Sequence, residues 1–393
     1  MHHLSINIIG DAFADVYCYL EGDMPRQGGD SRLNQPIHTV AGGSGLNTAT
    51  HLSSLLRNFW NDKSKNRTSN IILQTVINEN DDYGKLIVNH CNQHKLMIIN
   101  RRVSHQPACF FGTNEAINAN NNDKSTGHCA VIVSKGERSF MTHLGCMEDY
   151  KGEHILPNIQ DLDGTRRKTG TTTPVHNHIH IAGYFNIPGF WGGKLKTKLQ
   201  EIQQSLNSNT NTISLVPQHD ATEQWDGGIL DILDCVDFLI LSEVEAKGIS
   251  KYKGSDSKEQ SSTFLEHTIN FFAPYKRTHI IVTLGSQGAV VLGDGAVIHH
   301  QHTVPVDHPV DPTGAGDAFA AGFIKGFLCN MAVDNDRDEA ILEGGICGCA
   351  VGTNSVSMKG ASAPSTKESI QQTRNSIDEV CNEAKRRKVA TPF

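Results

Sequence analysis

The chain has 393 residues, with 35 lysines and arginines against 42 aspartates and glutamates, and a formal net charge of −7. This length corresponds to two modest domains or to one large domain with an appendage. Hydrophobic residues make up 38% of the chain, which suffices for a sizeable core and excludes an acidic disordered chain. The mildly acidic balance excludes the electrostatic pattern of a nucleic-acid-binding protein.

The ten cysteines form no C-x-x-C pair, and the amino-terminal residues lack the pattern of a secretory signal. No run of 18 apolar residues occurs, so no membrane partner is predicted. We therefore expect a cytoplasmic protein. The basic stretch at 384–389 could direct nuclear import, although a solvated basic helix end is the commoner explanation.

Short apolar runs alternate with longer segments of helical character along most of the chain. Several runs contain almost no polar residue, which is typical of parallel strands buried on both faces. The pattern predicts a doubly wound, mainly parallel α/β sheet flanked by helices. The predicted strands are 6–9, 71–77, 130–133, 179–182, 213–216, 238–241, 280–284 and 289–292, and the predicted helices are 45–57, 83–94, 194–205, 261–273, 316–329 and 339–351.

One region interrupts this alternation. Between residues 98 and 144, strand-like pieces at 108–112, 128–133 and 138–143 follow each other without a convincing helix. We therefore predict a small antiparallel sheet as a β-rich unit at 98–147, appended to an α/β core formed by residues 1–97 and 148–393. The Asn-rich stretch within this unit reads as a polar loop without a chemical role.

The strongest motif is the heptapeptide Asp-Pro-Thr-Gly-Ala-Gly-Asp at residues 311–317. Apolar aromatic residues recur every four positions after it, so a helix begins near the glycine turn. Free backbone N–H groups of a first helical turn bind phosphate or a developing oxyanion, which makes Gly314, Ala315 and Gly316 candidates for an anion hole. Asp317 would repel a phosphate, but it suits a general base that takes a proton from an attacking hydroxyl. The alternative is a plain turn with Asp317 favouring the helix start.

The heptapeptide resembles the second signature of the PfkB (ribokinase-like) family of carbohydrate kinases. The string Ala-Gly-Gly-Ser-Gly-Leu-Asn-Thr-Ala at residues 41–49 resembles the first, and the resemblance extends over residues 4–385. It implies a ribokinase-like fold in which the β-rich unit is a lid over the acceptor site. It also implies ATP-dependent phosphotransfer to a hydroxyl of a small sugar, with ATP as co-substrate, Mg²⁺, and a homodimer formed through the lid.

Acceptor contacts also follow from this resemblance. Asp15 stands where the family has a substrate-binding aspartate, with Asp11 as the competing candidate. A carboxylate there can accept two hydrogen bonds from vicinal hydroxyls. A second group of residues corresponds to the remaining acceptor wall: Gly42, Gly43, Asn47 and Asn186.

Nucleotide and metal contacts are implied in the same way. Residues 241–246 resemble the family's Asn-x-x-Glu motif, with Glu245 holding Mg²⁺ through water and Ser242 in place of the family asparagine. The segment 282–288 resembles the turn that borders the nucleotide, through Thr283, Gly285 and Gly288. The loop 355–361, together with Asp311 and Thr313, resembles a monovalent-cation site that could hold K⁺ through backbone oxygens.

Two other functions stay open at this stage. The acceptor could be a nucleoside, because Phe110, Phe111 and Phe140 of the predicted lid could stack on a base. Alternatively, the chain could be a catalytically idle binding protein, since Ser242 departs from the family motif. The alternating His176, His178 and His180 indicate a polar strand face rather than a zinc site.

Overall fold

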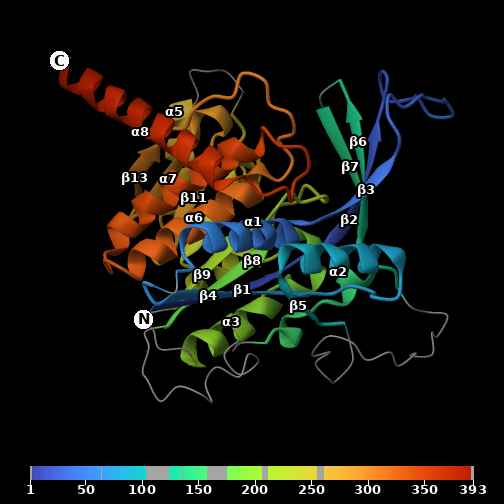
Figure 1. The fold of residues 1–393 in the computed structure, drawn as a ribbon, viewed down its shortest axis with the longest axis horizontal. Helices are drawn as coiled ribbons and strands as arrows, with labels where there is room; N and C mark the ends of the chain where they lie inside the picture. Colours follow the sequence, from blue (N-terminus) through green and yellow to red (C-terminus); the bar gives the residue numbers. More distant parts are fainter. Residues whose placement is uncertain are drawn as a thin grey trace.

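The computed structural model describes residues 2–62, 64–102, 124–135, 137–156, 175–205, 211–254 and 261–390. Within these residues, the dominant feature is a nine-stranded sheet with the order β13-β12-β11-β10-β9-β8-β1-β4-β5 (Figure 1). Its strands are β1 (His2–Gly10), β4 (Arg67–Thr75), β5 (Met97–Asn100), β8 (Val175–Ala182), β9 (Asn211–Val216), β10 (Phe238–Ser242), β11 (His279–Thr283), β12 (Ala289–Gly293) and β13 (Ala296–Gln301).

Neighbouring strands from β5 to β11 are parallel, and only the hairpin edge β11-β12-β13 is antiparallel. The central strands are buried on both faces, as their unbroken apolar runs predict. Such a sheet brings the carboxyl ends of its parallel strands to one edge, where open α/β folds bind ligands.

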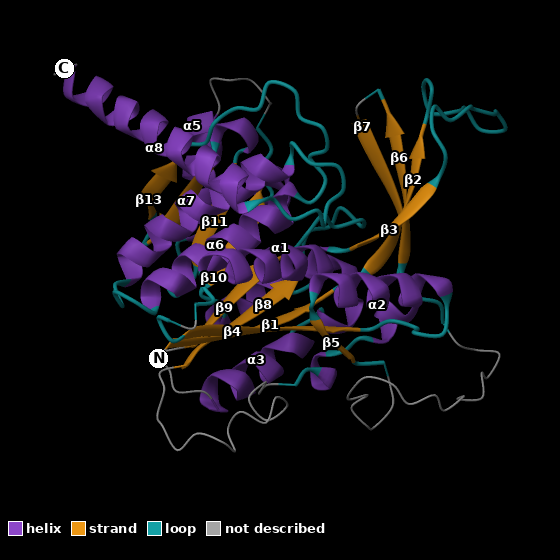
Figure 2. Cartoon of the chain, in the orientation of Figure 1, coloured by secondary structure: helices purple, strands orange, loops and turns teal. Residues whose placement is uncertain are grey.

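Helices cover both faces of this sheet (Figures 1 and 2). One apolar core joins the sheet to α1 (Ser44–Phe59), α2 (Asp82–His94), α6 (Ala315–Met331), α7 (Arg337–Ser355) and α8 (Lys367–Ala390). A second core joins the opposite face to α3 (Lys194–Ser205), α4 (Glu243–Ile249) and α5 (Ser261–Phe272). The predicted doubly wound, mainly parallel α/β fold is therefore confirmed.

A separate four-stranded sheet, called the small sheet below, stands beside the core in the order β3-β2-β6-β7 (Figure 2). Its strands are β2 (Phe13–Tyr19), β3 (His38–Gly42), β6 (His128–Ser134) and β7 (Glu137–His143). The predicted boundary of 98–147 includes most of β5, which belongs to the main sheet, and it leaves out β2 and β3. The reason is that β2 starts directly after β1, so the chain passes from one sheet to the other without a helix between them. The strand predicted at 108–112 lies outside the described residues.

Pairing in the small sheet is also mixed rather than purely antiparallel, because β2 runs parallel to β6. β2 pairs antiparallel with β3, and β6 pairs antiparallel with β7. Opposite residues of paired strands share a face, so Asp15, Tyr17 and Tyr19 of β2 face the same side as Arg138 and Phe140 of β7.

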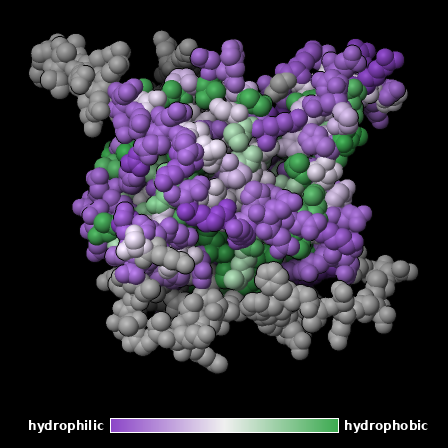
Figure 3. All heavy atoms as spheres, viewed as in Figure 1, coloured by the Kyte–Doolittle hydropathy of each residue, from purple (hydrophilic) through white to green (hydrophobic). Residues whose placement is uncertain are grey.

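Hydrophilic residues dominate the face of the molecule in Figure 3, with apolar residues scattered among them. No helix within the described ranges is both long enough and apolar enough to span a bilayer. The histidines of β8 have partners on β9: His178 lies 2.8 Å from both Thr212 and Ser214, and His180 lies 2.7 Å from Ser214. Hydrogen bonding within the sheet therefore satisfies both nitrogens of His178 and Nδ1 of His180, whereas His180 Nε2 is buried without a partner among the described residues.

Candidate active site

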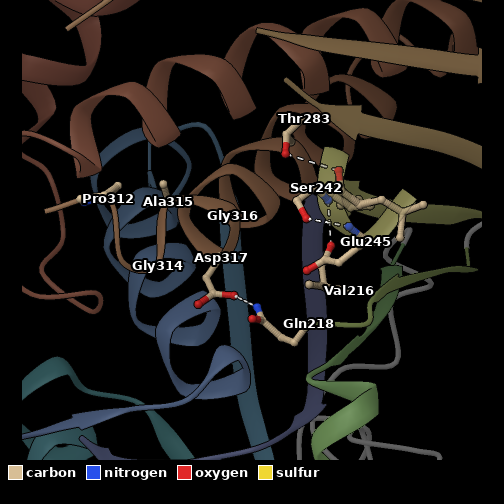
Figure 4. A pocket seen from close by; sticks show the side chains of 12 residues that line it. Val216, Gln218, Ser242, Glu245, Thr283, Pro312, Gly314, Ala315, Gly316 and Asp317 are labelled. Atoms are coloured by element: carbon tan, nitrogen blue, oxygen red, sulfur yellow. Dashed lines mark hydrogen bonds between the residues drawn. The ribbon is translucent and has the colours of Figure 1, made fainter. Parts of the chain in front are cut away.

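A cavity of about 190 Å³ opens at the carboxyl edge of the main sheet (Figure 4). It lies where β9, β10 and β11 end and where α6 begins. Its lining includes the glycine turn, Gln218, Ser242 and Glu245. None of the described residues that line it is basic, so any anion held here must be bound by backbone N–H groups, neutral side chains or a metal ion.

Asp317 lies in the first turn of α6 and is only 4% exposed. Its Oδ1 accepts hydrogen bonds from Ser44 Oγ at 2.7 Å and from Gln218 Nε2 at 2.9 Å. Its Oδ2 accepts from Asn47 Nδ2 at 2.9 Å. These three donors orient the carboxylate and leave Oδ2 with room for a further donor.

Burial raises the pKa of Asp317 from its ordinary value to about 7. The charges of Asp11 and Glu245 act in the same direction, while the hydrogen bonds from Asn47 and Ser44 oppose the shift. A carboxyl group that titrates near neutrality is well matched to accepting and releasing a proton under physiological conditions.

The glycine turn has the geometry of a helix N-terminus. Gly314 is the N-cap with φ +76°, a conformation that favours glycine. A side chain there would also collide with Ala361. The N–H of Ala315 donates to the carbonyl of Pro312 at 3.2 Å. Among the described residues, no acceptor is recorded for the N–H groups of Gly314 and Gly316, so these two remain available to an anion.

Two further predicted carboxylates, Asp11 and Asp15, come from the amino-terminal region. Asp11, fully buried, accepts hydrogen bonds from the Gly45 N–H at 2.9 Å and from Asn186 Nδ2 at 2.6 Å. Burial raises its pKa. The predicted acceptor residue Asn186 therefore contacts the competing candidate Asp11, in a contact held across β1 and β8.

Asp15 lies on β2 of the small sheet, and its carboxylate covers Gly42 so closely that a Cβ on Gly42 would overlap it. Burial raises the pKa of Asp15 to about 7, and the charges of Asp11 and Asp317 add to this shift. Gly43 has φ +94° and caps α1. The structure thus brings the predicted acceptor residues together, with Asp15 on one sheet and Asp11 on the other.

On the other side of the cavity, Ser242 and Glu245 form a capping box at the start of α4. Glu245 Oε2 accepts from the Ser242 N–H at 2.7 Å, and Ser242 Oγ accepts from the Glu245 N–H at 3.3 Å. Burial raises the pKa of Glu245. Its Oε1 has no recorded hydrogen bond to the described residues, so this oxygen fits a metal-bound water.

A second cavity, of about 320 Å³, adjoins the first and shares Thr283, Pro312, Ala315 and Gly316 with it. The predicted residues Gly285 and Gly288 line it, and both have a positive φ in the turn between β11 and β12. Sequence reasoning missed most of its apolar lining, which includes Val304, Pro305, Val306, Phe319 and Val356. Val304, Pro305 and Val306 carry no motif, and only the fold brings them together with Phe319 and Val356.

Asp311 precedes the glycine turn and forms an ion pair that the sequence did not predict. Its Oδ1 accepts from Arg138 Nη2 of β7 at 2.7 Å and from the Thr313 N–H at 2.9 Å. Its Oδ2 accepts from the Gly360 N–H at 3.1 Å. Arg138 was not predicted as a site residue, because its partner lies 173 positions away in the sequence.

Sequence reasoning also missed Ser44 and Gln218, the two further donors to Asp317. Ser44 is part of the first motif, but nothing in that motif marks its hydroxyl as a partner of the second. Gln218 follows β9 at the sheet edge and adopts φ +65°, a conformation uncommon for residues other than glycine. A polar residue at that edge of a parallel strand was the available signal.

The two sheets, the helix N-terminus with its buried carboxylate and the adjoining apolar cavity place the chain in the class of ribokinase-like folds. It superposes on the structure of ribokinase from Giardia lamblia with a TM-score of 0.67 and 18% identity, covering 94% of this chain and 99% of that one. The structure of Arabidopsis thaliana ribokinase complexed with ribose and ATP gives a TM-score of 0.58 and 19% identity, with 94% and 98% covered.

The family follows from the sequence match. The model of the pfkB family carbohydrate kinases matches residues 116–368, and the chain belongs to this family. Adenosine kinase 1 of Arabidopsis thaliana is 27% identical over 214 residues, which are 53% of this chain. The chain thus spans 57% of the length of that curated relative.

Proposed function

We propose that the chain transfers the terminal phosphoryl group of ATP to a hydroxyl of a small sugar. The observation that carries this proposal is the position of Asp317. A buried carboxyl group with a pKa of about 7 lies within one helical turn of two backbone N–H groups free to bind an anion. A base next to an oxyanion site is what in-line phosphotransfer to an alcohol requires.

In the proposed reaction, the acceptor hydroxyl donates its proton to Asp317 Oδ2 as its oxygen bonds to phosphorus. The bond from phosphorus to the bridging oxygen breaks, and ADP leaves with that electron pair. Ser44 and Gln218 hold Oδ1 by hydrogen bonds, so the carboxylate needs little reorientation. Asp11 and Asp15 would accept hydrogen bonds from other hydroxyls of the acceptor.

Charge on the transferring group is balanced by two features of this chain. Gly314 and Gly316 line the cavity, where their N–H groups would bind the phosphoryl oxygens, and the dipole of α6 adds partial positive charge there. Glu245 would hold Mg²⁺ through water, and the ion would neutralise phosphate charge.

The apolar second cavity, beside Thr283 and Gly285, suits the base of ATP.

A nucleoside acceptor is the second candidate. Phe140 is 56% exposed and lies on the same face of the small sheet as Asp15, where its ring could stack on a base. The similarity to adenosine kinase 1 also favours this candidate. Phe110 and Phe111, which were predicted for the same role, lie outside the described residues.

The test is an acceptor screen with Mg²⁺ and ATP, in which ADP release is measured over pentoses, hexoses and nucleosides. A pentose or hexose that gives the highest kcat/KM supports the first candidate, and a nucleoside supports the second. The control is D317N, which should lower turnover by about 10² to 10⁴-fold with every acceptor. ATP binding without ADP release for any acceptor would instead indicate an idle binding protein.

We also propose that two copies pair through the small sheet. β7 is an edge strand of that sheet, and its Met141 is 56% exposed. Edge strands offer unpaired backbone groups to a second chain. Light scattering coupled to size exclusion should give a mass of twice 42.9 kDa, and M141K should lower that mass to one chain's.

A further inference from the structure

The buried ion pair between Arg138 and Asp311 connects the small sheet to the segment that leads into α6. The two atoms lie 2.7 Å apart, and the side chains are 16% and 6% exposed. Two charged side chains with so little access to water are stable only when each neutralises the other. The pair therefore holds β7 against the start of the glycine turn.

Asp311 is one of the residues that the family resemblance assigns to a K⁺ site. In this chain, three nitrogen donors already bond its carboxylate: Arg138, the Thr313 N–H and the Gly360 N–H. Potassium requires oxygen ligands with free lone pairs. A cation bound at Asp311 would also lie beside the positive guanidinium in a region from which water is largely excluded. The loop carbonyls of Val356, Gly360 and Ala361 already accept hydrogen bonds as well, so neither these oxygens nor the Asp311 carboxylate fit a monovalent cation.

Neighbouring residues keep the guanidinium in place. Register in the small sheet puts Tyr19, Val133 and Arg138 on one face. Tyr19 and Arg138 are both opposite Val133 in this register, which places the Tyr19 ring on the same face as the pair. Lys359, the other described cation on this side, stacks over the Tyr19 ring and bonds Gln35 rather than Asp311.

The pair also orders the anion-binding turn itself. The Asp311 carboxylate accepts hydrogen bonds from the N–H of Thr313, which directly precedes Gly314, and from the N–H of Gly360. Gly314 in turn packs against Ala361. Fixing the Asp311 carboxylate thus fixes both segments that shape the turn.

We propose that the guanidinium of Arg138 supplies the positive charge that the family resemblance assigns to K⁺, so that the glycine turn is ordered without a monovalent cation. Arg138 is then a positioning residue that acts through Asp311. The catalytic part of this inference rests on the proposed function, whereas the cation response of folding does not.

The experiment compares melting temperatures of the full-length protein in KCl and in choline chloride at equal ionic strength, without ATP. The wild-type protein should melt at the same temperature in both salts. R138Q should melt at least 5 °C lower in choline chloride and regain most of that loss in KCl. R138K should behave like the wild type, because it keeps a cation.

The matched control is K135Q, which removes an exposed lysine at the β6–β7 turn, paired with Asp23, and should give no difference between the salts. A wild-type protein stabilised by K⁺ over choline overturns the proposal, as does an R138Q protein whose melting is indifferent to K⁺. If R138Q folds in neither salt, the double variant R138Q/D311N, which removes both charges of the pair, is the deciding test. A double variant that folds equally well in both salts supports the proposal, and one that does not fold overturns it.

Turnover adds a second readout once an acceptor is known. Wild-type kcat should be equal in the two salts, and the kcat of R138Q should rise at least tenfold on adding KCl. If no acceptor is phosphorylated but the melting pattern holds, the proposed function fails while this inference stands.

Discussion

Replacing Asp317 with asparagine should make the folded protein more stable at pH 8 and at the same time stop phosphotransfer. The substitution keeps the size of the side chain and removes its charge. Asp317 is buried beside Asp11 and Glu245, so the ionised carboxylate is costly in the absence of substrate. The two effects of D317N therefore have opposite signs, which few structural substitutions share.

The size of the stability effect follows from the pKa. The carboxyl group titrates at about 7 in the folded protein, against an ordinary value of 3.8. A raised acid pKa means that the folded state binds the proton more tightly. The free energy of unfolding therefore falls as pH rises from 3.8 to about 7, and the penalty is complete above pH 7. The difference of about three between these two pKa values corresponds to a loss of about 4 kcal/mol in the free energy of unfolding.

Lost hydrogen bonds reduce this gain. The new amide would direct a donor at Asn47 Nδ2, which now donates to Asp317 Oδ2 at 2.9 Å, at a cost of about 1 kcal/mol. Rotation of the Asn47 amide would turn its Oδ1, which is buried without a partner, toward the new donor. We expect D317N to be about 3 kcal/mol more stable than the wild type at pH 8 and close to equal at pH 4.5.

Urea denaturation at pH 4.5, 6, 7 and 8 measures this difference, and ADP release at pH 8 measures turnover, which should fall by about 10² to 10⁴-fold. D23N, at a residue 75% exposed, is the matched control and should change neither quantity. A D317N protein less stable than the wild type at pH 8 would refute the desolvation argument. Near-normal turnover would refute the assignment of the base.

Other substitutions test separate parts of the site and core. G42A should raise the KM for the acceptor at least tenfold with little change in the KM for ATP, because a Cβ there displaces the Asp15 carboxylate. A KM for the acceptor equal to that of the wild type would contradict this. E245Q should raise the Mg²⁺ concentration for half-maximal rate about tenfold, whereas an unchanged Mg²⁺ titration removes Glu245 from the metal site. R374M should lower the free energy of unfolding by about 2 kcal/mol, because it leaves the Glu343 carboxylate, held by two 2.7 Å bonds, without its partner; a urea midpoint equal to the wild type's contradicts that.

Local sequence patterns predicted the main sheet except its two edge strands, β5 and β13, and were insufficient for the small one. Unbroken apolar runs such as those of β9 and β10 identify strands buried on both faces. β2, with the sequence FADVYCY, mixes polar and aromatic residues and is only partly buried, so it lacks that signal. Its partner β6 follows more than a hundred residues later in the sequence, and no local pattern predicts such a pairing.

The same distinction applies to the site. Asp317 and the glycines were predicted because they form a contiguous motif, and the first helical turn carries its own chemistry. Ser44, Gln218 and Arg138 were missed because each acts through a contact made only by the folded chain. Asp11 and Asp15 were predicted as alternatives, but both approach the site, since adjacent sheets carry them.

The position of β1 in the sheet has a consequence for how the protein is made. Leu4 pairs with Ser69 of β4 and with His176 of β8, and its apolar core includes Ile377 of α8. During synthesis, β1 can therefore pair on both edges only after β8 has been made, and its apolar core is complete only after α8. Such non-local closure slows folding and prolongs exposure of apolar surface. We expect ribosome-stalled or carboxyl-truncated chains to depend on chaperones. These would keep the first sixty residues of one chain apart from those of another.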